Sequence, residues 1–291
     1  MPRSRAARAD DPLGGAARHL TCHYNRLARD LTAATSTHVD AELGKIFDLQ
    51  PNEDGDLVPS RGWRGRLNSA VAKAKAEFRR KNPTRRTRAA VLEAQDRIEV
   101  FQRRRFQRSM LDIANELDDP DDVEDRIAAG LIADIDGPEE SFQKENRKYA
   151  ELDLARKHFD DTVAALAAAA FLKRTNLGKL HKVVRSRYGI VRRRARTIAD
   201  DQSEKFAGNL DQVLFNAAGI EEYTWGTQQD ERVRPRHEEL EQSGERIKVN
   251  GPGVEGEGHP GDPPNCRCFM VPVGSSARRT RRRSLANTPT N

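Results

Sequence analysis

The chain has 291 residues, of which 36% are hydrophobic, 33% are charged and only 5% are aromatic. This length and apolar content predict one or two domains with modest cores and a largely solvated surface. The formal charge of +6 is compatible with contact to a polyanion, but 51 basic residues stand beside 45 acidic ones, so net charge alone does not establish nucleic-acid binding. Three cysteines do not make the disulfide framework of a small secreted protein.

The sequence also argues against membrane association. No apolar run approaches the length that spans a bilayer, and the longest, residues 163–172, is rich in alanine and is followed by lysine and arginine. Residues 1–15 contain arginines but no apolar core behind them, so they do not have the pattern of a secretory signal.

The apolar spacing predicts a helical body at residues 17–218, preceded by a flexible arm at residues 1–16. Leucines and a tyrosine recur at intervals of three and four residues through 15–49, which is typical of an amphipathic helix, and the Pro/Gly-containing sequence at 51–55 ends it. Further helices are expected at residues 63–80, 84–117, 138–176 and 180–217, with a short one after the aspartates of 118–122. Long helices with narrow apolar stripes usually pair as antiparallel hairpins or bundles. We therefore expect a mainly α fold built of elongated helical hairpins or a bundle.

The pattern changes after Gly219. Short strands are expected at residues 222–227, 246–249 and 268–273, beside a helix that starts after Pro235. These elements predict a small α+β module at residues 219–273. Residues 274–291 are too polar to fold alone, so we expect a disordered, arginine-rich tail.

Four side chains in this C-terminal module have the composition of a metal site: His237, His259, Cys266 and Cys268. A disulfide between the two cysteines is disfavoured because only one residue separates them. Two thiolates this close can instead face one cation, and two imidazoles would complete a tetrahedral Cys2His2 set that suits zinc. Arg267 between the cysteines could favour their thiolate forms by its charge. The opposing interpretation is an ordinary exposed histidine and two small strand residues on one face.

Two runs of sequence contain these side chains: Trp225-x-Thr227-x-x-Asp230-x-Arg232-Val233-Arg234-x-x-His237-x-x-Leu240 and His259-Pro260-Gly261-x-Pro263-Pro264-Asn265-Cys266-Arg267-Cys268. With Ile198-Ala199-Asp200-Asp201-Gln202 and Ala218-Gly219-Ile220 upstream, they resemble the signature of phage head-morphogenesis proteins, the Mu F-like minor head family, over residues 180–273. Two positions depart from the family pattern: Asp200 stands where arginine is expected, and Glu241-Gln242 follows Leu240 where glycine is usual.

The resemblance implies a low-copy structural protein inside the capsid, near the portal vertex and the DNA, that acts in head assembly, DNA packaging or ejection. The implied partners are the portal protein or the major capsid protein and packaged double-stranded DNA, with no membrane and no small-molecule substrate. The implied location is the virion, and the host cytoplasm during assembly. The tail could neutralise DNA phosphates or contact an acidic portal surface through five residues: Arg278, Arg279, Arg281, Arg282 and Arg283. The arginine runs 103–105 and 192–194 lie in predicted helices and are expected on solvated or salt-bridged faces.

A metal-dependent nucleic-acid enzyme is the alternative. His237-Glu238-Glu239 matches the H-x-E half of a zinc-deaminase signature, but the required P-C-x-x-C half is missing. A nuclease could recruit Asp230 and the two histidines, although the carboxylate cluster of two-metal cleavage is not evident. Four protein ligands would close the zinc site and make it structural, so we expect no enzyme and no catalytic residues.

Overall fold

The computed structural model describes residues 13, 15, 17–53, 56–117, 122–171 and 175–274. The chain forms two compact units: unit 1 comprises Met1–Ala17, Ala94–Phe142 and Asp200–Asn291, and unit 2 comprises Arg18–Glu93 and Gln143–Ala199. The described part is mainly helical, as the sequence predicts, with small sheets. No helix in the described ranges is long and apolar enough to cross a membrane.

Unit 2 is built almost entirely of helices. Its elements are α1 (Arg18–Thr35), a π-helical segment (Ser36–Asp40), α2 (Leu43–Phe47), β1 (Leu49–Pro51), β2 (Leu57–Pro59), α3 (Trp63–Lys81), the first part of α4 (Thr84–Asp112), a second π-helical segment (Tyr149–Arg156), α7 (Lys157–Ala170) and the first part of α8 (Leu177–Ala217). The strands β1 and β2 pair antiparallel, from Leu49 opposite Pro59 to Pro51 opposite Leu57. The predicted break at 51–55 therefore belongs to a β-hairpin, and the helix predicted for 15–49 ends at Thr35.

Polar groups as well as apolar stripes join the helices of unit 2. The predicted stripe of α1, including Tyr24, is fully buried. The Tyr24 hydroxyl donates to the backbone carbonyl of Asn146 at 3.0 Å, which ties α1 to α6 (Asp136–Lys148). At the end of α1 the hydroxyl of Thr35 donates to the Leu31 carbonyl, so the Nε2–H of His158 donates to Thr35 at 2.9 Å. These buried bonds fix the pairing of α1 with the α6–α7 stretch.

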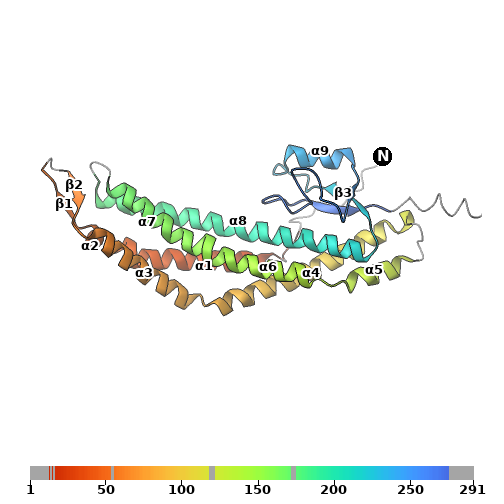
Figure 1. The fold of residues 1–291 in the computed structure, drawn as a ribbon, viewed down its shortest axis with the longest axis horizontal. Coiled ribbons are helices and arrows are strands. Elements are labelled where there is room, and N and C mark those ends of the chain that lie inside the picture. Colours follow the sequence, from red (N-terminus) through yellow and green to blue (C-terminus); the bar gives the residue numbers. More distant parts are fainter. Residues whose placement is uncertain are drawn as a thin grey trace, which may run out of the picture. The chain divides into compact units, whose positions relative to one another are not determined.

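Unit 1 combines helices with a three-stranded sheet. Its further elements are a 3-10 turn (Ala114–Glu116), α5 (Val123–Leu131), β3 (Glu222–Gly226), α9 (Pro235–Ser243), β4 (Ile247–Lys248) and β5 (Phe269–Pro272), together with the second parts of α4 and α8 and the start of α6. The strand order is β4-β3-β5, and both pairs are antiparallel. The three strands and the helix after Pro235 confirm the prediction for this region (Figure 1).

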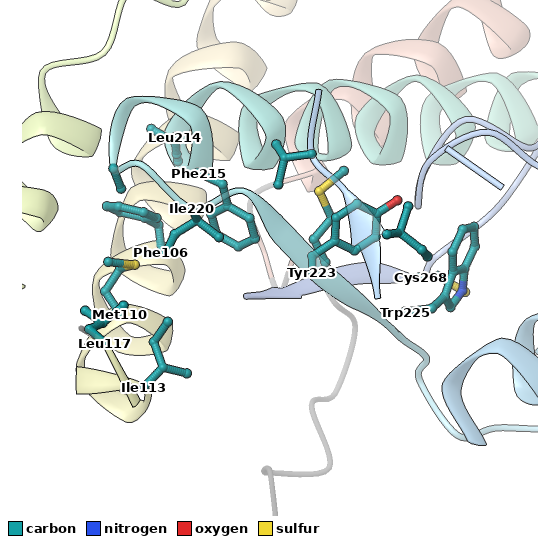
Figure 2. Packing of buried hydrophobic residues seen from close by; sticks show 14 of the residues in the cluster. Phe106, Met110, Ile113, Leu117, Leu214, Phe215, Ile220, Tyr223, Trp225 and Cys268 are labelled. Carbon is teal, nitrogen blue, oxygen red and sulfur yellow. The ribbon is translucent and has the colours of Figure 1, made fainter. Parts of the chain in front are cut away.

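The sheet of unit 1 does not have a core of its own. Its buried residues join those of α4 and α8 in one cluster, in which Phe106 and Met110 lie at one end and Trp225 and Cys268 lie at the other, with Tyr223 between (Figure 2). Tyr223 and Trp225 alternate on β3 and are at most 1% exposed, because successive side chains of a strand point to opposite faces. The small α+β module predicted at residues 219–273 therefore shares its core with α4 and α8.

The arginine runs 103–105 and 192–194 were expected on solvated or salt-bridged helix faces. Arg103 pairs with Glu99 at 2.7 Å, Arg105 lies 3.7 Å from Asp211, and Arg194 lies 3.6 Å from Asp161, which confirms salt-bridged faces for these three arginines. The predicted N-terminal arm and C-terminal tail, including the arginines at 278–283, lie outside the described residues except for Leu13, Gly15 and Gly274.

Candidate metal centre

Three of the four predicted ligands converge in unit 1. The Nδ1 atom of His237 lies 3.3 Å from the sulfur of Cys268 and 3.7 Å from the sulfur of Cys266. The three ligand atoms all lie within 4.8 Å of one another. His237 is 2% exposed, Cys266 is 3% exposed and Cys268 is 9% exposed. The soft donors therefore face a common, enclosed point.

Local structure places each of these side chains. Pro235 starts α9, where proline is tolerated because the first helical N–H groups have no partner in the helix. His237 and Leu240 are buried on the side of α9 that packs on β3, and the imidazole centroid is 4.9 Å from the Trp225 ring. The cysteines precede β5 at alternate positions, so both sulfurs are buried while the residue between them points elsewhere.

Arg267 does not serve the cysteines as the sequence suggested. Its guanidinium donates to both carboxylate oxygens of Asp230, at 2.7 and 2.8 Å, and lowers the pKa of that carboxyl. Asp230 also accepts from the backbone N–H of Arg232 at 3.1 Å, as an aspartate at a turn does. Its guanidinium partner is Arg267 and not Arg232 or Arg234, so this pair braces the outer side of the loop.

Glu257 fixes the orientation of the His237 ring. Its Oε2 lies 2.9 Å from Nε2, so the Nε2–H donates to the carboxylate and the lone pair of Nδ1 faces the sulfurs. Histidines that bind metals commonly donate their second N–H to such a carboxylate. Sequence reasoning missed Glu257, because a glutamate in the Gly-rich run 251–258 has no characteristic spacing from the cysteines.

The two thiols are already polarised. Hydrogen bonding from Cys268 lowers the pKa of Cys266, whereas the same bond and burial raise the pKa of Cys268. The indole N–H of Trp225 is buried without a nitrogen or oxygen acceptor and favours the thiolate of Cys268. Two potential thiolates, one imidazole lone pair and a spare N–H donor toward sulfur fit a zinc-type cation better than a hard one.

His259 is not in this group, which reduces the predicted four ligands to three. Its Nε2 lies 2.9 Å from the Gly251 carbonyl and must donate there, so its Nδ1 accepts from the Tyr223 hydroxyl at 2.8 Å. Both ring nitrogens are therefore occupied. The backbone N–H of His259 donates to Asp262 at 2.7 Å, so this residue holds the loop that leads to the cysteines.

The cysteine loop is seated on α8. The backbone N–H of Asn265, a residue with φ of +56°, donates to Asp201 at 2.8 Å. A Cβ added at Gly208 would lie 2.4 Å from the carbonyl oxygen of Pro260. Two segments quoted for the resemblance thus meet in space: residues 198–202, which lie inside α8, support the loop that contains Cys266.

Gly208→Ala tests this seating. The added methyl group meets backbone, which cannot rotate away, so we expect a loss of about 1–3 kcal/mol in the free energy of unfolding in urea. Gly189→Ala on the same helix is the matched control, because the Cβ there would meet only the end of the Arg193 side chain at 3.5 Å. The control should gain about 0.5–1 kcal/mol. Equal effects of both substitutions would show that the loop does not press on α8.

Comparison with known proteins finds a family match that includes the candidate metal centre. Residues 161–271 match the family described as phage Mu protein F-like protein. An uncharacterized protein of Haemophilus influenzae is 40% identical over 81 residues, which are 28% of this chain and 17% of that relative. The aligned part of the chain thus spans less than a fifth of the relative. No solved structure matches the chain significantly.

Proposed function

We propose that this chain is a phage minor head protein, a structural protein located inside the capsid near the portal vertex. The observation that carries the proposal is the Mu F-like domain at residues 161–271. Its work would be interaction with the portal or major capsid protein and with packaged DNA during assembly, packaging or ejection. The long helices of the described chain, with exposed polar faces, suit such contacts better than they suit a substrate cleft.

We also propose that His237, Cys266 and Cys268 hold a structural zinc ion. The ion would be bound by one residue of α9 and by two residues of the segment before β5. It would thus cross-link these two segments. Zinc supplies ligation energy without redox chemistry. Because its ligands are at least 91% buried, an ion there would brace the domain rather than meet a macromolecular substrate.

One observation favours the enzyme alternative. With His259 elsewhere, three protein ligands leave a fourth coordination position open, as in zinc enzymes that hold a water there. The expected argument that four ligands close the site no longer applies. However, the Glu239 side chain of the H-x-E half is 67% exposed and lies 3.5 Å from Arg236. Glu257 is occupied by His237. Neither carboxylate is placed as a proton shuttle, so the structural role is the better supported one.

Two experiments test these assignments. Particles purified from an infected culture should contain the chain together with the portal protein, and its absence from particles would refute the head-protein role. Purified protein with zinc or magnesium should neither cleave nor deaminate single- or double-stranded DNA. Turnover that Glu239→Gln abolishes, while the fold stays intact, would instead establish the enzyme.

The arginine-rich tail gives a further prediction. Deleting residues 275–291 removes five cations that we expect to contact phosphates, so the slope of log K against log salt for duplex DNA should fall by about 4 to 5, at about 0.9 per contact. The salt dependence of fluorescence anisotropy measures this slope. Unchanged DNA retention and portal recruitment at low salt would contradict a role for the tail.

A further inference from the structure

The corner between α3 and α4 gathers the most basic sequence of the described chain. Between Glu77 and Glu93 there is no acidic residue, and residues 79–88 include six cations: Arg79, Arg80, Lys81, Arg85, Arg86 and Arg88. The chain turns at Asn82 and Pro83 between α3 and α4 (Figure 1), so these cations lie in the last turn of one helix and the first two turns of the next.

Most of these charges are uncompensated. Lys81 pairs with Glu77 at 2.6 Å. Arg79, Arg80, Arg85 and Arg88 are exposed, and none of them has a carboxylate within 4.0 Å among residues 17–53, 56–117, 122–171 and 175–274. The paired arginines at 103, 105 and 194 show how the chain neutralises cations elsewhere. A cluster of like charges without acids is unfavourable by itself and favours a bound polyanion.

The surface at this corner is hollowed. Two hollows of about 630 and 430 Å³ adjoin it, and both are lined by Thr84 and Thr87. Arg79 lines the first, and Arg85, Arg88 and Arg147 line the second. The first turn of α4 has no acidic residue, so the partial positive charge of the helix start adds to that of the arginines. Hydroxyl and guanidinium groups and a helix start thus line two adjoining hollows, of which the first is also lined by Glu151 and the second by no carboxylate among the described residues.

We propose that this basic corner, residues 79–88 with Arg147, binds the sugar-phosphate backbone of double-stranded DNA without reading its sequence. Guanidinium groups match phosphate oxygens with two parallel N–H donors. The aromatic rings of the first hollow, Phe78 and Phe159, are only 7% and 2% exposed, so none is presented for the base stacking that single strands use. This site would be a DNA-contact surface of the proposed minor head protein. It rests on that proposed function only for the statement that the DNA is the packaged genome.

The full-length chain with Arg79→Gln, Arg85→Gln, Arg88→Gln and Arg147→Gln tests this site. Binding to a short fluorescein-labelled duplex of mixed sequence is measured by anisotropy from about 50 to 200 mM salt. If each arginine meets one phosphate, the slope of log K against log salt falls by about 3 to 4, and affinity at the lower salt falls at least about tenfold. Unchanged slope and affinity would overturn the proposal.

A charge-matched control separates the site from net charge. Arg29→Gln, Lys182→Gln, Arg192→Gln and Arg193→Gln remove the same charge from exposed positions of the same unit, and binding should change less than about threefold. Replacing the four corner arginines by lysine keeps the charge and should keep most of the salt slope, which guards against loss of binding by misfolding. An equal effect of both glutamine sets would refute a localised site.

Competition identifies the ligand class. Unlabelled duplex should displace the probe from the wild-type chain. The phosphate concentration that it needs should be far lower than the carboxylate concentration that polyglutamate needs for the same displacement. If polyglutamate competes equally well, the corner is a surface for acidic proteins and the DNA assignment is wrong. This assay uses naked DNA, so absence of the chain from particles would refute the minor head role without affecting this result.

Discussion

Full-length protein purified without chelators is expected to contain about one zinc per chain, and Cys266→Ser, Cys268→Ser or His237→Ala should each abolish it. The reason is geometric: two sulfurs and one imidazole nitrogen within 4.8 Å provide the donors, and a set of two cannot hold the ion. Elemental analysis by mass spectrometry measures the content. Native protein without stoichiometric metal would end the assignment.

Loss of the ion should also destabilise unit 1. Isolated zinc modules owe about 10–16 kcal/mol to their metal. We expect a smaller loss here, of a few kcal/mol, because Trp225 and its neighbours already share a core with α4 and α8. Trp63→Phe leaves Trp225 as the single tryptophan, 4.9 Å from the His237 ring, so its fluorescence reports unfolding in urea beside the site. A chelator should lower the unfolding midpoint of this variant but not that of its Cys266→Ser derivative.

Two matched variants separate ligation from support. His259→Gln removes the bonds to Tyr223 and Gly251 and should lower stability while the zinc content stays at the wild-type value. Glu257→Gln keeps the size of the side chain but removes the charge beside His237, and it should weaken zinc affinity about 10- to 100-fold. Loss of zinc in His259→Gln with the fold intact would show that His259 is a fourth ligand.

The long helices were predictable because their apolar residues recur with the helical period and because Asn82-Pro83 and Gly219 end them clearly. The hairpin at Leu49–Pro51 and Leu57–Pro59 was not, since its strands have three residues each and no extended alternation. Both π-helical segments were also missed. A π-turn adds about one residue to a helical turn, and segments of five and eight residues hold too few apolar positions to reveal that change of spacing.

At the site, sequence spacing identified the cysteines and His237, because alternate positions before a strand bring two sulfurs to one face. It could not separate His237 from His259. Both are buried and both follow a turn, and the difference lies in partners remote in sequence: Tyr223 occupies one ring and Glu257 orients the other. The basic corner was missed because it, too, depends on how segments of the folded chain come together. Asn82-Pro83 was interpreted only as a helix boundary, although the boundary is what gathers the arginines on either side.

Acid is expected to weaken unit 2 through two buried histidines. Burial lowers the pKa of His23 to about 4, assisted by Arg26 and Arg86, and burial lowers the pKa of His158 to about 4, with Arg194 adding to the effect. In the unfolded chain both have a pKa near 6.5. Each therefore contributes stability that is present above pH 6.5 and is lost as the pH falls toward 4, by up to about 3 kcal/mol.

His158→Gln measures one of these contributions. The glutamine can still donate to Thr35, which accepts from His158 at 2.9 Å, but it does not titrate. The difference in the free energy of unfolding between the wild type and this variant should shrink as the pH falls from 6.5 to 4. Trp63, which lies in unit 2, is the fluorescent probe in a Trp225→Phe background. A difference that stays constant with pH would show that His158 is protonated without cost.

Asp211 should act with the opposite sign in unit 1. Burial raises the pKa of its carboxyl to about 6, although Arg105, the Met270 backbone and Gln102 favour its charged form. Its unfolded pKa lies near 3.9. A group that binds its proton more tightly in the folded state contributes stability that is full below the unfolded pKa and is lost as the pH rises through the folded pKa. Relative to Asp211→Asn, the wild type should therefore lose up to about 3 kcal/mol between pH 4 and 6. Urea titrations of both proteins at a series of pH values measure this change, and a parallel pair of curves would mean that Arg105 and Gln102 keep Asp211 ionised throughout.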